Sequence, residues 1–318
     1  MSCQLDPEIA AFVDRLQADW ARFPPLEEMS LDDARAAAEI VRAPLRQGGP
    51  EMAETREIRL DLAPGPLRIR LYRPAGIADG NAPVLVYLHG GGFVYFSIDT
   101  HDRLMREYAQ SAGCAVLGVD YPLAPEHRYP VALDRLEALI DWLGDHASDL
   151  GLAPARIALG GDSAGANLAL AALLRLRARG QAQRIRALVA NYPAFGPEVS
   201  DAAEAAFGGP GAILNRQEMA YYFRQYTGTG ATPADPGACP ALETELAGLP
   251  PILLIAAECD VLCEQAETMA ARMEAAGTPA TLRIYPGTTH SFLEAMASAA
   301  VARRAIADTA IWLKARWA

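Results

Sequence analysis

The sequence has little positive charge, no long apolar run and few cysteines, and each shortage excludes a class of protein. Its 318 residues carry a formal net charge of −11, which argues against nucleic acid or an anionic membrane as a partner and weakly favours a neutral or cationic small ligand. No apolar run approaches the roughly 20 residues that span a bilayer. The first eight residues lack the basic and apolar segments of a signal peptide. We therefore expect a cytoplasmic protein.

The cysteines are five, an odd number scattered along the chain at positions 3, 114, 239, 259 and 263. This distribution indicates free thiols in a reducing cytoplasm rather than a disulfide framework. Cys259 and Cys263 lie close together, but a tetrahedral metal site needs more ligands nearby. We expect no metal and no cofactor.

The N-terminal residues read as helices that cover another part of the protein. Asp6 and Pro7 are a helix cap and a first helical residue, and apolar side chains follow at helical spacing at Ile9, Phe12, Val13, Leu16 and Trp20. A second helix is predicted from Ser30, with Asp33 in the capping-box position. Because these one-sided helices precede the first strand signals, residues 1–47 are predicted to be a cap on a catalytic domain at 48–318.

The rest of the chain predicts an α/β fold in one domain. From Glu57 the apolar period changes to two, which predicts two antiparallel edge strands joined at Pro64 and Gly65. Short runs that are apolar on both faces then alternate with helical stretches, which indicates a parallel sheet covered on both sides. These runs are 84–88, 115–119, 156–160, 187–190, 252–256 and 281–285. The last of them could pair across a homodimer, as edge strands can.

A Gly, Pro, Ala and Thr-rich insertion at about 195–249 separates two of these strands. It contains one clear helix, capped by Asn215 with Glu218, whose apolar stripe is Met219, Tyr222, Phe223 and Tyr226. Such a stripe usually packs on a core. Part of the same surface could also line an acyl or alcohol pocket, and the two interpretations are compatible.

Residues 161–165, Gly-Asp-Ser-Ala-Gly, fit the G-x-S-x-G nucleophile elbow. An apolar run precedes them and an Ala/Leu helix follows, which is the strand, turn and helix order that the motif requires. Glycines at 161 and 165 let strand and helix approach closely, so that the hydroxyl of Ser163 stands clear at the tip of the turn.

A serine of this kind needs a base and an orienting carboxylate, which follow it in the chain. His290 is the one histidine after Ser163, on a loop at the carboxyl end of a predicted strand, where ligands bind in open α/β sheets. Glu258 and Asp260 both leave the preceding strand. We favour Asp260, because a few residues of loop are needed to bring the carboxylate to the histidine.

Donors for the oxyanion are expected in His89-Gly90-Gly91-Gly92, which directly follows a parallel strand. His89 precedes the serine, so we assign it the task of holding the glycine loop by hydrogen bonding rather than catalysis. His101 lies between acidic residues. A helix cap at Asp99 or Thr100 explains this stretch better than a metal site.

With both motifs placed, the chain resembles the hormone-sensitive-lipase-like group of α/β-hydrolases, and within it the bacterial acetyl esterases. The matching stretches are 89–93, 99–102, 120–127, 161–167, 207–209, 285–287 and 290–292. The resemblance implies a mostly parallel eight-stranded sheet, with helices on both faces and a helical cap built from the N-terminal segment and the insertion.

The same resemblance implies site roles. Ser163 would be the nucleophile, Asp260 the orienting acid and His290 the general base, with the amides of Gly91, Gly92 and Ala164 as oxyanion donors. Two departures stand out. Glu264 occupies the position of an aspartate that supports the acid, and the segment 94–98, Val-Tyr-Phe-Ser-Ile, is bulkier than usual and would narrow the pocket.

The expected function is therefore that of a serine hydrolase of short-chain, acetyl-like esters, with a small ester as substrate and a monomer or homodimer as the active form. The same triad supports hydrolysis of amides or other acyl bonds. A noncatalytic ligand receptor on this fold, as in the plant gibberellin receptors, lacks the histidine that this chain retains at position 290.

Overall fold

The computed structural model describes residues 3–77, 80–228 and 234–317, and the described strands form one sheet of eight in the order β1-β2-β4-β3-β5-β6-β7-β8. β3 to β8 run parallel, whereas β2 is antiparallel to both of its neighbours. The strands are β1 (Glu54–Leu62), β2 (Gly65–Arg73), β3 (Ala82–Leu88), β4 (Ala115–Asp120), β5 (Leu152–Asp162), β6 (Ile185–Asn191), β7 (Ile252–Ala257) and β8 (Ala280–Tyr285). The predicted α/β class and strand number are confirmed.

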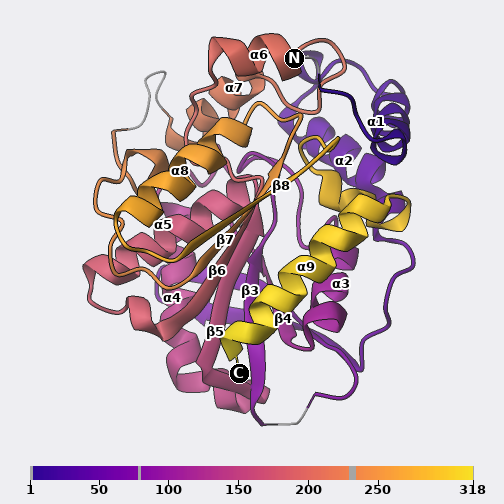
Figure 1. The fold of residues 1–318 in the computed structure, drawn as a ribbon. Coiled ribbons are helices and arrows are strands. Elements are labelled where there is room, and N and C mark those ends of the chain that lie inside the picture. The colour runs from indigo at the N-terminus through magenta and orange to yellow at the C-terminus, as the bar shows by residue number, and fades with distance from the viewer. Residues whose placement is uncertain (1–2, 78–79, 229–233, 318) are drawn as a thin grey trace.

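Helices cover both faces of this sheet (Figure 1). In Figure 1, α4, α5 and α8 lie on one side of the sheet and α3 and α9 on the other, while α1, α2, α6 and α7 gather at one end. The helices are α1 (Pro7–Trp20), α2 (Leu31–Arg42), α3 (Asp102–Ala112), α4 (Val131–His146), α5 (Ala164–Ala178), α6 (Asp201–Phe207), α7 (Arg216–Thr227), α8 (Cys263–Ala275) and α9 (Ala300–Trp317). Short 3-10 turns are η1 (Leu26–Glu28), η2 (Ala43–Arg46), η3 (Ala147–Leu150), η4 (Ala182–Arg184), η5 (Pro240–Leu242) and η6 (Phe292–Ala297).

The central strands are buried on both faces because each face carries its own apolar layer. Along β3, Val84 and Val86 belong to one layer and Leu85 and Tyr87 to the other, which is the alternation that the strand pleat imposes. β1 pairs with β2 from Leu62 opposite Gly65 outward, as a hairpin at the edge of the sheet.

Local capping signals set three helix starts where the sequence predicts them. Asp6 accepts from the Glu8 amide at α1, and Ser30 accepts from the Asp33 amide at α2. At α7, Asn215 and Glu218 form a complete capping box. These bonds satisfy backbone donors that a helix start leaves free.

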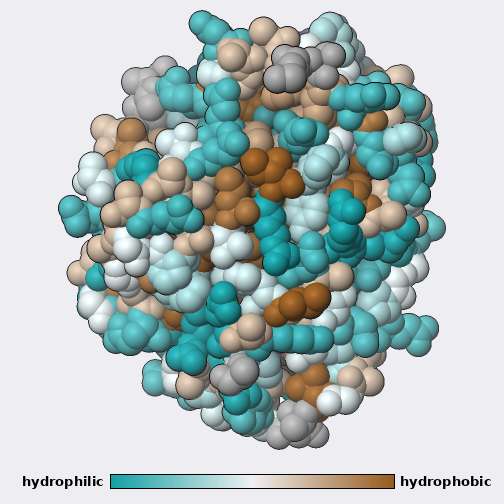
Figure 2. Space-filling model, viewed as in Figure 1, coloured by the Kyte–Doolittle hydropathy of each residue, from teal (hydrophilic) through white to brown (hydrophobic). Residues whose placement is uncertain are grey.

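The surface mixes polar and apolar side chains. Figure 2 shows hydrophobic residues dispersed among hydrophilic ones on this face, as expected for a chain with few exposed large apolar side chains. Among the helices of the described residues, none has the length and apolarity needed to cross a bilayer.

Candidate active site

Ser163 occupies a sharp turn between the end of β5 and the start of α5. Its backbone adopts φ 52° and ψ −116°, a strained conformation for a residue with a side chain. The Ser163 amide donates to the Asn191 carbonyl of β6 at 2.9 Å. A Cβ at position 165 would collide with the Leu88 carbonyl, so only glycine lets α5 pack this close to β3. The predicted strand, turn and helix are confirmed.

The structure brings Ser163, His290 and Asp260 into one hydrogen-bonded row. His290 Nε2 lies 3.0 Å from Ser163 Oγ, and His290 Nδ1 lies 2.7 Å from Asp260 Oδ2. The other carboxylate oxygen of Asp260 accepts from the Leu262 amide at 2.9 Å. All three side chains are buried, with residue exposures of 8%, 5% and 3% for Ser163, His290 and Asp260. This geometry suits proton transfer from the hydroxyl to Nε2.

The electrostatic surroundings favour protonation of His290. Burial of the imidazole lowers its pKa, but the charge of Asp260 and the hydrogen bond to it outweigh burial and hold the pKa of His290 above its ordinary value. Tyr192 packs edge-on against the ring, with centroids 5.0 Å apart. Its packing leaves the imidazole little freedom to turn away from the serine.

The other two carboxylates near this loop do not reach the histidine. Glu258 Oε2 accepts from the Gly287 amide at 2.8 Å. Glu264, the departure from the family pattern, is exposed on α8. The Leu262 amide therefore supplies Asp260 with the support that was in question, and it belongs to the backbone, which side-chain patterns do not reveal.

The glycine loop lies against the same site. Gly91 and Gly92 line a cavity that also contains Ser163 and His290. Ala164 is the first residue of α5, and the first amides of a helix have no acceptor within the helix. These three residues thus adjoin the serine, and their amides are the candidate donors for an oxyanion site.

His89 contacts the glycine loop rather than the serine. Its Nδ1 lies 2.7 Å from the Gly90 carbonyl, and its own carbonyl accepts from the Tyr121 hydroxyl at 2.8 Å. The ring stacks on Tyr121 with centroids 4.4 Å apart. Burial and the nearby charge of His101 lower the pKa of His89 to about 4. A neutral imidazole in this place fits the supporting task expected of it.

The expected helix cap at Asp99 or Thr100 is wrong. α3 begins after His101, whose side chain does not cap it, and Asp99 instead pairs with Arg70 at 2.6 Å. His101 is buried, with Nε2 3.3 Å from Asp162 Oδ2. The charged partner of His101 is therefore Asp162, 61 residues away in the chain, and not an acidic neighbour in sequence.

The hydrogen bonds around His101 favour its charged form. The Thr100 hydroxyl donates its one proton to the Ser97 carbonyl at 2.8 Å, so it can only accept from His101 Nδ1, 2.9 Å away. In this arrangement both ring nitrogens donate, as they do in an imidazolium. Burial lowers the pKa of His101, but the Asp162 carboxylate outweighs burial and raises it. Asp162, the variable residue of the elbow, also accepts from the Tyr87 hydroxyl at 2.9 Å.

A second buried ion pair links α2 to the turn after His290. Arg42 Nη1 lies 3.0 Å from Glu294 Oε2, and both side chains are buried. The Arg42 guanidinium also lies over the Phe96 ring, 4.8 Å from its centroid. Sequence reasoning missed this pair because its members are far apart in the chain and neither belongs to a motif.

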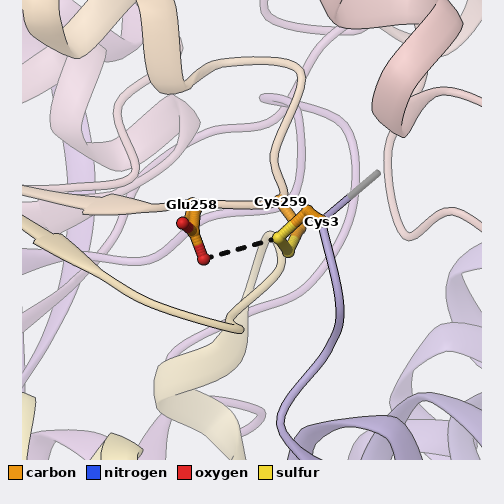
Figure 3. A group of neighbouring side chains, drawn as sticks. All are labelled: Cys3, Glu258 and Cys259. Carbon is orange, nitrogen blue, oxygen red and sulfur yellow. Dashed lines mark hydrogen bonds between the residues drawn. A yellow bond between two sulfur atoms is a disulfide. The ribbon is translucent and has the colours of Figure 1, made fainter. Parts of the chain in front are cut away.

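The prediction of five free cysteines is wrong for two of them. Cys3 and Cys259 form a disulfide across a sequence separation of 256 residues. Figure 3 shows the N-terminal segment meeting the loop that leaves β7 at this bond, with Glu258 Oε2 3.5 Å from Cys3 Sγ. The disulfide withdraws both sulfurs from metal coordination, although these three side chains lie close enough to share an ion. No spacing rule connects cysteines so distant.

The cavity over Ser163 has a volume of about 500 Å³ and is lined by the N-terminal helices, the glycine loop and the insertion. Tyr95 and Phe96, from the segment predicted to narrow the pocket, form part of its wall. The remaining lining residues include Leu16, Trp20, Phe23, Leu26, Arg42, Ile213, Leu214, Glu218, Tyr222 and Glu294. Such a volume suits a small organic ligand.

Known proteins are similar to this chain in sequence and in fold. An ethyl acetate hydrolase of Pseudomonas putida is 33% identical over 91% of this chain and 92% of its own. An acetyl esterase of Salmonella schwarzengrund is 34% identical over 79% of this chain and 77% of its own. A hyperthermophilic esterase of the archaeon Pyrobaculum calidifontis superposes with a TM-score of 0.89 at 32% identity, covering 98% of both chains.

A family model described as the alpha/beta hydrolase fold matches residues 85–294. That range begins in β3 and ends just after His290, so it contains the glycine loop, the elbow and the loop after β7 that carries Asp260. The match and the superposed esterase agree with the α/β architecture and sheet described above. The chain therefore belongs to the alpha/beta-hydrolase family.

Proposed function

We propose that this carboxylic ester hydrolase cleaves short-chain acyl esters through an acyl-enzyme formed on Ser163. The observation that carries the proposal is the unbroken hydrogen-bonded row from Ser163 Oγ through His290 to Asp260. A buried serine becomes a nucleophile when a base removes its proton, and an orienting carboxylate stabilises the imidazolium that results.

In the first half of the reaction, Ser163 Oγ attacks the ester carbonyl while its proton passes to His290 Nε2. The tetrahedral intermediate collapses as His290 returns that proton to the departing alcohol, which leaves an acyl-serine. In the second half, water attacks the acyl carbon while His290 Nε2 takes its proton, and the second tetrahedral intermediate collapses as His290 returns that proton to Ser163 Oγ, which releases the acid.

The oxyanion of each intermediate would be held by the amides of Gly91, Gly92 and Ala164. Each such donor is typically worth on the order of 10²–10³ in rate. His89 and Gly90 support the loop, and no metal or cofactor is needed in this scheme. Asp162 supports the elbow from beneath, through its bonds to His101 and Tyr87.

The short-chain preference rests on the names of the relatives, an ethyl acetate hydrolase and an acetyl esterase. We assign the chain further to the hormone-sensitive-lipase-like group, with residues 1–47 and about 195–249 as the cap and 48–318 as the catalytic domain. Residues 229–233 of that insertion lie outside the described residues. We propose a monomer or a homodimer paired through β8. The expected cytoplasmic location stays a prediction, and the disulfide argues against it.

The test is hydrolysis of p-nitrophenyl esters from acetyl to decanoyl. We expect kcat/KM to be highest for the shortest acyl chains, and to fall by at least about 10⁴-fold in Ser163→Ala and His290→Ala. Ser148→Ala, on an exposed turn far from the cavity, is the matched control. Absence of activity on every ester, or full activity in Ser163→Ala, would contradict the proposal.

A further inference from the structure

Glu218 is a carboxyl group in the cavity wall without a cationic partner among the described residues. One of its oxygens accepts from the Asn215 amide at 3.0 Å, as the capping box requires. An ionised carboxylate can accept about four hydrogen bonds, so acceptor capacity is left over. The cavity's other carboxylates differ, because Asp162 faces His101 at 3.3 Å and Glu294 faces Arg42 at 3.0 Å.

Aromatic rings surround the same cavity. Those that line it are Trp20, Phe23, Tyr95, Phe96 and Tyr222. The face of the Phe96 ring is already covered by the Arg42 guanidinium. Tyr222 lies one helical turn after Glu218, so that its ring and the carboxyl share a face of α7. Tyr222 packs directly over Gly92, and Tyr95 meets it edge-on with centroids 6.1 Å apart. Such rings attract cations through their faces.

The charge of Glu218 depends on pH near neutrality. Burial raises the pKa of Glu218 to about 7, and the charge of Glu204 adds to this, while the Asn215 amide and His290 act in the opposite sense. Tyr95 and Tyr222 also face it, as uncharged phenols at neutral pH. Arg42 belongs to the same cavity but is held by Glu294. Above neutral pH the cavity therefore carries an unbalanced negative charge within an aromatic wall.

We infer that the site accepts esters bearing an alkylammonium group in the part of the molecule that does not react, with Glu218 as its counter-ion and aromatic rings around it. Desolvated ammonium groups bind to such rings and to a carboxylate with additive attraction. The formal charge of −11 on the whole chain favours the approach of a cation as well. The inference rests on the proposed hydrolysis at Ser163.

The test compares esters that differ only in charge. On the alcohol side the pair is 2-(trimethylammonio)ethyl acetate and 3,3-dimethylbutyl acetate. On the acyl side it is the ethyl esters of 4-(trimethylammonio)butanoate and 5,5-dimethylhexanoate. In at least one pair, we expect kcat/KM for the cation to exceed that of its neutral isostere by on the order of tenfold at pH 8. This ratio should fall as the pH drops through about 7, the pKa of Glu218.

The ratio isolates Glu218 from the catalytic histidine, because titration of His290 affects both esters of a pair alike. Glu218→Gln keeps the capping box, which glutamine can also complete. In this variant the ratio should fall to the part that the rings alone sustain and lose its dependence on the charge of Glu218. Glu264→Gln removes the same charge from the exposed start of α8 and should leave the ratio unchanged.

If the enzyme hydrolyses the neutral esters and prefers the cationic isostere in neither pair, the inference is overturned and the proposed function stands. The same holds for a preference that is undiminished in Glu218→Gln or is reduced equally in Glu264→Gln. Hydrolysis of neither member of either pair, nor of p-nitrophenyl acetate, would contradict the proposed function and the inference together. Circular dichroism of Glu218→Gln separates a lost charge from a lost helix.

Discussion

Asp162, the residue before the nucleophile, forms a buried ion pair with His101, with Oδ2 of the aspartate 3.3 Å from Nε2 of the histidine. The Asp162 carboxylate also lies so close to Gly90 that a Cβ there would collide with it. The pair therefore joins the elbow to the glycine loop. It also gives Asp162, the residue next to Ser163 in the motif, a physical role.

Replacing Asp162 by Asn should destabilise the protein strongly, because His101 must then either stay charged without its partner or give up its proton in a buried place. Loss of one member of a buried pair typically costs about 3–5 kcal/mol in the free energy of unfolding. Urea unfolding at pH 6 measures this. The double variant Asp162→Asn with His101→Gln should recover part of the loss. A single variant as stable as the wild type would contradict the assignment.

The same pair predicts how stability depends on pH. The pKa of His101 is raised in the folded protein above its ordinary value of 6.5. Its contribution is thus complete below pH 6.5 and is lost as the pH rises through the folded value. The pKa of Asp162 is lowered, so its contribution disappears only under acidic conditions, as the pH falls below 3.8 toward the folded value. Urea midpoints of the wild type should decline above pH 6.5, and less steeply in the double variant.

On the acid side of the pH profile, kcat/KM should fall with a midpoint above pH 6.5. His290 must be neutral to accept the serine proton, and Asp260 raises the pKa at which it becomes so. The profile of kcat/KM for p-nitrophenyl acetate measures this value in the free enzyme. A limb centred at or below pH 6 would show that Asp260 does not stabilise the imidazolium.

Asp260→Asn should lower kcat by about 10⁴-fold while leaving the fold intact, because the imidazole then loses its orienting carboxylate. Glu258→Gln is the matched control on the same loop. Glu258 contacts the Gly287 amide and not His290, so this variant should stay close to wild-type activity. The reverse ranking would place the acid at Glu258.

An alkylating reagent should modify three free thiols, those of Cys114, Cys239 and Cys263. Unfolding in urea with iodoacetamide and no reductant should add three groups to the chain. Reduction beforehand should add five, because the Cys3–Cys259 disulfide then opens. Intact mass spectrometry distinguishes the two. Five groups without reduction would contradict the bond.

What the sequence predicts well depends on neighbours along the chain. Capping at Asn215 and Glu218 involves residues three apart, and the apolar runs of the sheet are short and continuous. Helix α6 was missed, although Ser200 followed by Asp201 is a usable cap signal. Turn residues and apolar periodicity thus predict the helices and strands. The order of the motif residues along the chain was enough to predict that Ser163 and His290 act together.

What the sequence did not predict depends on contacts between distant segments. Cys3 meets Cys259, His101 meets Asp162, and Arg42 meets Glu294 only after the crossovers and the N-terminal helices have been placed. Propensity and spacing carry no information on such partners. The sequence shows only the acidic neighbours of His101, whereas its partner belongs to the elbow itself.

Covalent trapping of Ser163 tests the central claim most directly. Diethyl p-nitrophenyl phosphate presents a tetrahedral electrophile to an activated serine and releases p-nitrophenol when the serine attacks. We expect one diethylphosphoryl group per chain, on the peptide that contains Ser163, with parallel loss of esterase activity and no labelling in Ser163→Ala. A label on another residue, or equal labelling of Ser163→Ala, would contradict the account.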